Sequence, residues 1–521
     1  MYCKYCGKRI MESHKFCAYC GNKVVESTQY EINNEHTVAE QYTNVDSNNN
    51  KRKGSKGVKV VCGIILLIVG AIVSFFVIAA VDGIIEAIKE EPLNNNTDIQ
   101  TYSESQNDNN GDDEGSDDII DGNKSDIDTV PLLTFLLSFN DSKMSTDATD
   151  WNDFIYGNGY YDTGSVDDYY MECSKGKFTF VPAKESNGIE NDGIIEATVN
   201  INHPCFNFTR EEDDYYTEGF EFFENVLNAT DEYIDFKEYD INKDGYIVPE
   251  ELTIVFVFSG YEIYEEFDSD FTTYSCSLIY DEYFAIDDIL IDECIYTAEK
   301  DPYNERDNQM VGIGVLCHEL GHALDLPDLY DTDYSSQGLA FHCLMAAGVD
   351  NSYRYDPYGT SPAPLIAWER EFLGFEDPQV ITNNGTYSVY ARSTDDYNIL
   401  KIEDGRGYYL IENVDYQGFG KGLDMYLKRP GIAIWYVNSS IASNQSRFDD
   451  NTVNTNEKKY GVTLIEANDT KDMLDKDFDY QGVYDHYHYL KGDNAFTSAS
   501  GIIIEILDNP GDEMRVKITL P

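Results

Sequence analysis

The chain has 521 residues and a formal net charge of −59, because 96 acidic residues outnumber 37 basic ones. This surplus of carboxylates suits hard cations and disfavours a nucleic-acid partner, since phosphate binding needs a basic surface. Full disorder is also disfavoured, because 42% of the residues are hydrophobic and 13% are aromatic, which is enough to build a core. The length allows about three domains.

The N-terminus contains two C-x-x-C pairs, formed by Cys3, Cys6, Cys17 and Cys20. This spacing favours a Zn²⁺ ion held tetrahedrally by four thiolates, which leave no open position for catalysis. So short a segment cannot bury a core, so zinc would have to fold it. Residues 1–25 resemble the small zinc ribbons at the N-terminus of many bacterial membrane proteins. The alternatives are reduced thiols without metal, or a redox pair. Residues 26–57 are polar and Asn-rich and are interpreted as a linker.

An apolar run of 22 uncharged residues covers positions 60–81. As a helix it would be about 33 Å long, against a hydrocarbon core of about 30 Å, so we predict a single transmembrane helix over residues 58–85. Residues 1–60 carry a net charge of +4 and the remainder −63. The positive-inside rule then predicts a single-pass protein of the cell membrane, with a cytoplasmic N-terminus and an extracellular catalytic region. A buried core helix and a cleaved signal peptide are the alternatives. The cytoplasmic partner of the ribbon stays unidentified.

Residues 86–129 are dense in Asn, Asp, Ser and Glu and predict an acidic, disordered stalk. A calcium-binding tract is the alternative. After the stalk, the apolar runs at 130–141 and 252–260 predict buried strands, and residues 165–182 predict a helix followed by a strand.

Residues 240–251 follow the pattern of a calcium loop, D-x-N-x-D-G with a glutamate at the twelfth position. Asp240, Asn242 and Asp244 would supply side-chain oxygens, Tyr246 its carbonyl oxygen, and Glu251 a bidentate carboxylate. The alternative is an Asx-rich turn without metal.

The most informative motif is HELGH at positions 318–322, preceded by the apolar run VGIGVLC. The run predicts a buried helix over residues 311–324. On a helix, His318 and His322 lie on one face and can bind one metal ion, with Glu319 beside them to accept a proton from a metal-bound water.

Asp328 lies ten residues after His318, where long-motif zinc peptidases place their third ligand. Two histidines and one aspartate satisfy a catalytic zinc, which needs three protein ligands and one open position. Asp328 could instead be a surface carboxylate, and Asp331 is a weaker rival ligand. Met345 is a candidate for the Met-turn below the metal, with plain core packing as the alternative.

The segment HELGHALDLPDLYD, the turn at Met345 and the segment SPAPLIAWEREFLGF at 361–375 together resemble the immune inhibitor A-type secreted bacterial metallopeptidases. The resemblance extends over about residues 130–521. It implies a metzincin-like fold, peptide-bond hydrolysis, zinc held by His318, His322 and Asp328, and Glu319 as the base. The family usually has glycine at the seventh position after the first histidine, where this chain has Asp325. Asp adopts the left-handed conformation more readily than most residues, so we expect the bend to be kept.

The predicted fold class is an α+β zincin or metzincin-like catalytic domain over residues 130–379, joined to a mostly β C-terminal module over residues 380–521 and preceded by the ribbon and the transmembrane helix. Short strands separated by turn signals predict the C-terminal module. They cover residues 386–391, 407–413, 431–438, 461–468, 501–507 and 514–520.

The predicted function is a membrane-anchored, extracellular zinc endopeptidase that cleaves proteins or peptides, with calcium as a second metal. The substrate would add as a strand along residues 252–260. The alternatives are a catalytically inactive, adhesin-like surface protein and a membrane sensor. The sequence leaves two interpretations for each of four further side chains. Cys317 and Cys343 would form a bridge or remain free thiols, and Tyr353 or Tyr355 would stabilise an oxyanion or be loop residues. His342 is interpreted as structural.

Overall fold

The computed structural model describes the chain from residue 128 onward, with gaps. The described ranges are 128–157, 163–204, 222–262, 272–273, 276–286, 289–302, 310–333, 335–354, 356–427, 429–449, 451–456, 459–468, 472–474 and 487–521. The predicted zinc ribbon, linker and transmembrane helix lie outside these ranges, as does almost all of the predicted stalk. The structural zinc on Cys3, Cys6, Cys17 and Cys20 therefore stays a prediction.

The prediction of a transmembrane helix needs correction. Among the helices of the described ranges, none is both long enough and apolar enough to cross a bilayer. The longest of them, α5 (Ile313–Ala323), has 11 residues, which is about 16 Å against the roughly 30 Å of a hydrocarbon core. This finding corrects the predicted fold class and the predicted single-pass membrane location, because no described helix supports the membrane span on which both depended.

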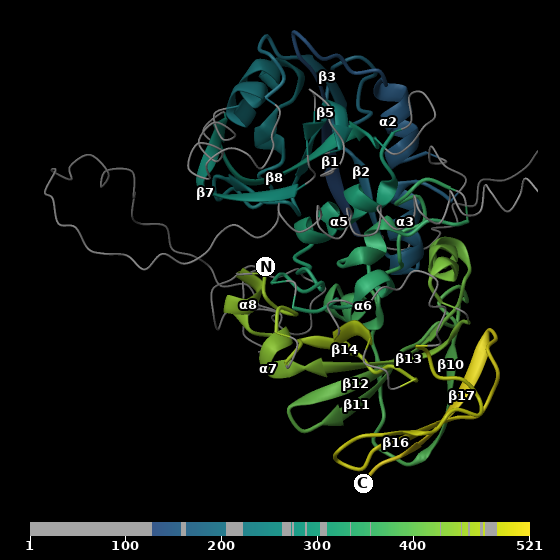
Figure 1. Cartoon of the computed structure of the whole chain (residues 1–521). Helices are drawn as coiled ribbons and strands as arrows, with labels where there is room; N and C mark the ends of the chain where they lie inside the picture. Colours follow the sequence, from purple (N-terminus) through teal and green to yellow (C-terminus); the bar gives the residue numbers. More distant parts are fainter. Residues whose placement is uncertain are drawn as a thin grey trace, which may run out of the picture.

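The N-terminal part of the described chain is built on one mixed sheet with β1 and β5 at its centre (Figure 1). β1 pairs in parallel with β2 and β3 on one edge and with β5 on the other. β8 continues the sheet in parallel with β5, and β7 closes it in antiparallel pairing with β8. The strands are β1 (Asp128–Ser138), β2 (Phe178–Pro182), β3 (Ile194–Thr198), β4 (Tyr246–Ile247), β5 (Thr253–Glu262), β6 (Thr272–Thr273), β7 (Cys276–Ile286) and β8 (Ile289–Lys300).

Both faces of this sheet are buried, so its central strands have continuous apolar sequences. In β1, Leu132 and Leu136 belong to the core on the side of α5, whereas Leu133, Phe135 and Leu137 belong to the core on the opposite side. The strands predicted at 130–141 and 252–260 are confirmed, as is the helix-then-strand pattern of residues 165–182. The helices of this part are α2 (Ala148–Ile155), α3 (Val166–Ser174), the helical residues 222–230, and the short turns η1 (Asp231–Tyr233) and η2 (Phe236–Glu238).

The predicted substrate strand was wrong. β5 forms backbone hydrogen bonds with β1 on one side and β8 on the other, so it has no edge to which a peptide could add. An apolar run shows that a strand is buried, but it does not show whether the strand is central or at an edge. Among the described strands, β7 is the outer one on the β8 side of the sheet.

The C-terminal module packs two antiparallel-rich sheets face to face. The apolar side chains of both sheets meet in a shared core, including Val389 and Val516 from one sheet and Ile411 and Ile434 from the other. All six predicted strand segments contain an observed strand. The strands are β10 (Gly385–Tyr390), β15 (Phe496–Thr497), β16 (Ile503–Ile506) and β17 (Glu513–Thr519) in one sheet, and β9 (Gln379–Val380), β11 (Leu400–Asp404), β12 (Gly407–Val414), β13 (Gly431–Asn438) and β14 (Val462–Leu464) in the other.

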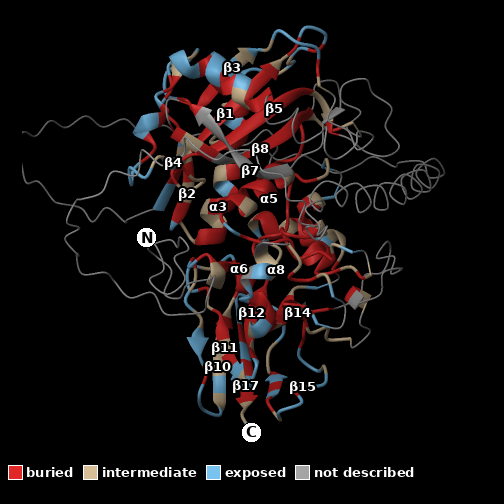
Figure 2. Ribbon diagram, turned by 90° about the vertical axis from the view of Figure 1, so that its left-hand side faces the viewer, coloured by how far each residue is buried: buried red, intermediate tan, exposed pale blue. Residues whose placement is uncertain are grey.

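Short helices connect the two parts and frame the module. Figure 1 shows α5 beneath the large sheet and α6 between α5 and the C-terminal sheets. In Figure 2 the buried residues run from β5 and β8 through α5 into β12, and one core contains Leu320 of α5 together with Leu410 and Trp435 of the module. These helices and turns are η3 (Ala340–His342), η4 (Ala347–Asp350), α6 (Ala367–Phe372), η5 (Gly418–Met425), α7 (Ser439–Ala442), α8 (Gln445–Asp449) and η6 (Asp472–Leu474).

A buried carboxylate joins the two parts. The Glu412 side chain on β12 is fully buried and accepts a hydrogen bond from the backbone N–H of Ala367, at the start of α6, at 3.1 Å. It also accepts hydrogen bonds from Arg392 at 2.7 and 2.6 Å, from the Tyr397 hydroxyl at 2.9 Å and from the Trp435 indole at 2.8 Å. The module is therefore fastened to the helix that follows the Met345 turn.

Candidate metal site

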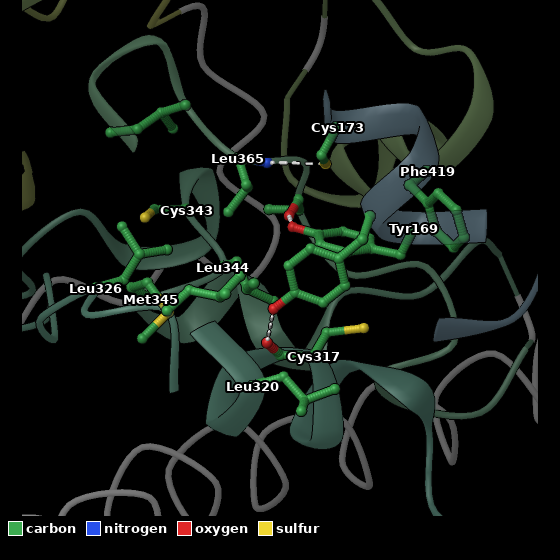
Figure 3. Packing of buried hydrophobic residues seen from close by; sticks show 14 of the residues in the cluster. Tyr169, Cys173, Cys317, Leu320, Leu326, Cys343, Leu344, Met345, Leu365 and Phe419 are labelled. Atoms are coloured by element: carbon green, nitrogen blue, oxygen red, sulfur yellow. Dashed lines mark hydrogen bonds between the residues drawn. The ribbon is translucent and has the colours of Figure 1, made fainter. Parts of the chain in front are cut away.

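Helix α5 carries the predicted histidine pair and is held by very close packing. A Cβ atom added to Gly314 would lie 2.0 Å from the Val349 carbonyl oxygen, so only glycine lets these backbones approach. A Cβ on Gly321 would lie 2.7 Å from the sulfur of Met345. Figure 3 shows Met345 with Leu344 and Leu326 beside this helix. The fully buried Met345 side chain thus packs against a glycine that lies between His318 and His322.

The structure brings the three predicted ligands together. The Nε2 atoms of His318 and His322 lie 3.2 and 3.3 Å from Oδ1 of Asp328. The two imidazole rings are perpendicular, with centroids 4.9 Å apart. Within the described part of the chain, these residues form a group of His, Cys, Asp or Glu whose ligand atoms all lie within 4.8 Å of one another.

Backbone carbonyl groups set the orientation of both imidazoles. Nδ1 of His318 lies 3.0 Å from the Leu344 carbonyl oxygen, and Nδ1 of His322 lies 2.8 Å from the Leu326 carbonyl oxygen. A carbonyl can only accept, so each Nδ1 carries the hydrogen and donates it. In the neutral rings, both Nε2 lone pairs are then directed at the space in front of Asp328. Metal-binding histidines are commonly held in this way.

Two other side chains hold the far oxygen of Asp328. Its Oδ2 atom accepts a 2.6 Å hydrogen bond from the Tyr330 hydroxyl and another from the Asn451 amide. The Asp328 backbone N–H in turn donates to Oδ1 of Asn451 at 2.8 Å. The carboxylate is fixed at one oxygen, and the other faces the imidazoles.

These donor atoms fit a zinc ion. Oδ1 of Asp328 is buried and has no hydrogen-bond partner, and it faces two nitrogen lone pairs that cannot donate to it. Three electron-rich atoms this close repel one another unless a cation lies between them. Two imidazoles and one carboxylate are a usual ligand set for catalytic zinc. The His322 side chain is 16% exposed, against 3% for His318 and 1% for Asp328, so solvent reaches the group from the side of His322.

The pKa shifts of His318 and Asp328 also indicate that a positive charge is favoured between these side chains. Burial lowers the pKa of His318, but the hydrogen bond that its protonated ring would donate to Asp328 and the charge of Glu319 more than offset this, so that its pKa lies above the usual value. Burial raises the pKa of Asp328, but the charge of a protonated His322 and the hydrogen bonds that protonated His318 and His322 would donate lower it far below the usual range. Glu319 is itself buried on α5, one residue after His318.

Asp325 makes the bend that the family resemblance expects of glycine. It has a φ of 67°, in the left-handed region, directly after α5. The N–H of Leu326 donates to the Gly321 carbonyl at 3.0 Å and that of Asp325 to the His322 carbonyl at 2.8 Å. This is the Schellman pattern, which ends a helix and turns the chain back. The turn places the Leu326 carbonyl beside His322 and leads directly to Asp328.

We expect that Asp325→Gly keeps or slightly raises the free energy of unfolding, because glycine adopts this φ without strain. Asp325→Val should lower it by about 1–2 kcal/mol, because the β-branched residue disfavours the left-handed region. Thermal unfolding of the two purified variants measures the order. If valine were tolerated as well as glycine, the left-handed turn at this position would be contradicted.

The predicted calcium loop adopts a turn in which backbone N–H groups donate to its side chains. Asp240 accepts from the N–H groups of Asp244 and Gly245, both at 3.1 Å, and Asn242 accepts from that of Asp244 at 2.9 Å. The Asn242 N–H lies 3.3 Å from Oε1 of Glu251, and that of Tyr246 donates to Asp244 at 2.9 Å. Glycine at 245 has a φ of 88°. These hydrogen bonds are those of the metal-free alternative as well, so calcium stays a prediction.

The structure separates the other candidates from the ligand group. Asp331 accepts hydrogen bonds from Ser335 and Ser336 and is not part of the cluster. The suggested Cys317–Cys343 bridge was wrong, since both are free, buried thiols. His342 is buried against Tyr487 and His488, in agreement with a structural role. The Tyr353 ring stacks with the Arg354 guanidinium at 4.6 Å, and Tyr355 lies outside the described residues.

Sequence reasoning missed the groups that orient the ligands. Tyr330 stands two residues after Asp328, and its place in the LPDLYD segment could have suggested a local hydrogen bond. Asn451 lies 123 residues away from Asp328, and no motif marks it. The carbonyl partners of the histidines depend on the path of the chain, which the residue types do not determine.

Comparison with known proteins agrees with this geometry. Residues 302–376 match the family described as immune inhibitor A peptidase M6, catalytic domain. The matched range contains all of α5, Asp328 and the Met345 turn. The resemblance stated above over residues 130–521 is thus matched over this shorter range.

Two curated relatives are similar to a shorter stretch. The pre-pro-metalloprotease PrtV of Vibrio cholerae serotype O1, strain M66-2, is 39% identical over 62 residues, which is 12% of this chain and 6% of the relative. The PrtV of strain ATCC 39315 / El Tor Inaba N16961 gives the same identity and coverage. The chain therefore spans a small fraction of these relatives' length. Together with the family match, they indicate a metallopeptidase.

Proposed function

We propose that the chain is a zinc-dependent endopeptidase that hydrolyses protein or peptide bonds at the group formed by His318, His322 and Asp328. One observation carries the proposal. Two Nε2 lone pairs converge on one unpartnered carboxylate oxygen, from which they lie 3.2 and 3.3 Å away. The family match over residues 302–376 supports zinc as the metal and a peptide bond as the target.

The side chains of this chain would divide the chemistry between them. His318, His322 and Asp328 would hold zinc, which polarises a scissile carbonyl and lowers the pKa of a water molecule at its open position. Glu319, one residue from His318, accepts the proton that the attacking water loses and gives it to the leaving amine. Met345 would pack against Gly321 and so keep the part of α5 that carries the two histidines rigid. The exposed side of His322 leaves room for the substrate.

Hydrolysis of an unstructured protein such as casein tests the proposal. The purified full-length chain should cleave it, a zinc chelator such as 1,10-phenanthroline should abolish cleavage, and added zinc should restore it. His322→Ala should be inactive with or without added zinc, because it removes a ligand. Cleavage that survives both the chelator and His322→Ala would overturn the proposal. Bound zinc without hydrolysis of any protein would favour the inactive, surface-binding alternative.

We also propose that Asp240, Asn242, Asp244, Tyr246 and Glu251 bind calcium, as their spacing predicts. The loop lies directly before β5 in the chain, so binding should stabilise the sheet that supports α5. A calcium-selective chelator should then lower the melting temperature in the presence of excess zinc, and calcium should restore it. Asp240→Asn together with Glu251→Gln should abolish this difference. An equal melting temperature with and without calcium in the unchanged chain would contradict the site.

A further inference from the structure

The third candidate ligand is held by a residue from the other part of the molecule. Asn451 follows α8 in the C-terminal module, yet its side chain makes two hydrogen bonds to Asp328. Its Oδ1 accepts from the Asp328 N–H at 2.8 Å, and its amide donates to Oδ2 of the carboxylate. One side chain therefore fixes both the backbone and the carboxylate of the same residue.

The contact is part of a longer seam between two segments. The amide of Asn454 donates to the Leu329 carbonyl at 3.2 Å. Thr332 is hydrogen bonded to Thr455, and Ser336 to Tyr460. The Gln337 N–H donates to the Met473 carbonyl at 3.0 Å. The segment that begins with Asp328 is thus docked against the module at Asn451, Asn454, Thr455, Tyr460 and Met473.

We propose that Asn451 is a positioning residue of the metal site, so that the C-terminal module completes the site instead of merely adjoining it. This inference rests on the proposed role of Asp328 as a zinc ligand. The Asn451 amide and the Tyr330 hydroxyl both occupy Oδ2. They leave Oδ1 as the oxygen directed at His318 and His322.

The geometry explains why asparagine suits the position. Asn451 has a φ of 48°, a left-handed conformation that asparagine tolerates better than most residues. Its amide offers a donor to the carboxylate and an acceptor to the backbone N–H at the same time. Aspartate would keep the backbone conformation and the acceptor. It would lose the donor and set a second negative charge against Oδ2 of Asp328.

Zinc affinity and cobalt spectra test the proposal in the full-length chain with Cys3, Cys6, Cys17 and Cys20 replaced by serine, which removes the predicted thiolate site. Zinc is titrated against a competing chelator, and cobalt substitution reports the coordination geometry. Asn451→Asp should weaken zinc binding by about 10–100-fold, the usual cost of losing such an orienting partner, and should change the cobalt absorption bands. Asn451→Gly keeps the left-handed backbone without a new charge and should show a smaller loss in the same direction.

Asn398→Asp is the matched control. Asn398 is half-buried in the same module and also pairs its side chain twice, accepting from the Tyr390 N–H at 2.9 Å and donating to the Ser388 carbonyl at 3.1 Å. It is not among the residues of the ligand group, so this variant should lower thermal stability and leave zinc affinity and the cobalt spectrum unchanged.

Three results would overturn the inference. If both Asn451 variants bound zinc as tightly as the unchanged protein while Asp328→Ala did not, the positioning role would fail and the proposed ligand set would stand. If Asn398→Asp weakened zinc binding as much as Asn451→Asp, the effect would be general loosening. If Asp328→Ala bound zinc normally, the ligand assignment and this inference would both fall.

Discussion

Glu319→Gln is expected to reduce peptide-bond hydrolysis by about 10²–10⁴-fold, the usual contribution of a general base. The substitution keeps the size and shape of a side chain that is buried on α5 beside His318. It removes the carboxylate that would accept the proton of the attacking water. Glutamine also leaves the three proposed ligands in place. The variant should therefore bind zinc as the unchanged protein does, and fold to the same thermal stability within a few degrees.

The comparison of kcat with zinc content separates catalysis from metal binding. Undiminished cleavage by a Glu319→Gln protein of normal zinc content would contradict the assignment of the base. Loss of zinc along with activity would show that Glu319 acts on the metal site itself. Asp333→Asn, on the loop after the ligand group, is the control for a lost carboxylate, and it should leave kcat unchanged.

Glu412→Gln is expected to cause the largest loss of stability, about 3–5 kcal/mol in the free energy of unfolding, as when one partner of a buried ion pair is removed. The carboxylate is fully buried and accepts two hydrogen bonds from Arg392. Glutamine would leave the guanidinium charge buried without its counter-ion. It would also disturb the bond to Ala367 that fastens α6 to the module. Chemical denaturation of the two proteins measures the difference.

Because of Glu412, the free energy of unfolding should also depend on pH. Burial raises the pKa of Glu412, but the charge and hydrogen bonds of Arg392 outweigh burial and lower the pKa from 4.5 to about 2. Because the folded pKa is depressed, the stabilisation is present above about pH 4.5 and is lost as the pH falls toward 2. The Glu412→Gln variant should lack this part of the acid dependence.

The exposed Glu403 provides the control for the Glu412 experiment. Its side chain is 67% exposed on β11 and lies 3.9 Å from Lys401. Surface ion pairs of this kind contribute about 0–1 kcal/mol, so Glu403→Gln should change stability little. A Glu412→Gln protein as stable as Glu403→Gln would contradict the view that the buried carboxylate joins the two parts.

Local patterns predicted the centre of the candidate site well. The apolar run before HELGH predicts a buried helix, and α5 covers residues Ile313–Ala323 of the predicted 311–324. A helix brings residues four apart onto one face, so the histidine pair follows from the helix alone. Asp328 followed from its distance along the chain, because the turn at Asp325 is short and has little freedom.

Contacts between segments that lie far apart in the sequence could not be predicted from such local patterns. The pairing of Asp328 with Asn451 depends on how the module docks, as does the position of β5 between β1 and β8. The prediction of a peptide added along residues 252–260 was wrong for this reason. Periodicity predicts which strands are buried, whereas strand order depends on the whole topology.

The described residues do not bear out the Cys317–Cys343 bridge or the transmembrane helix. Cys317 and Cys343 are both free, buried thiols, and the Cys343 thiol donates a hydrogen bond to Glu369 at 3.0 Å. The transmembrane helix was predicted from hydropathy alone, and no helix in the part that the structure describes bears it out. The calcium loop follows its motif closely. Its side-chain oxygens can also be satisfied by hydrogen bonds from backbone N–H groups, without a metal ion.

The central claim is that His318, His322 and Asp328 bind a zinc ion. An anomalous difference map, recorded at the zinc absorption edge from crystals of the zinc-loaded chain, tests it most directly. We predict a strong peak about 2.0–2.2 Å from Nε2 of both histidines and from Oδ1 of Asp328. A map without a peak at these three atoms, or with zinc bound only elsewhere in the chain, would contradict the account.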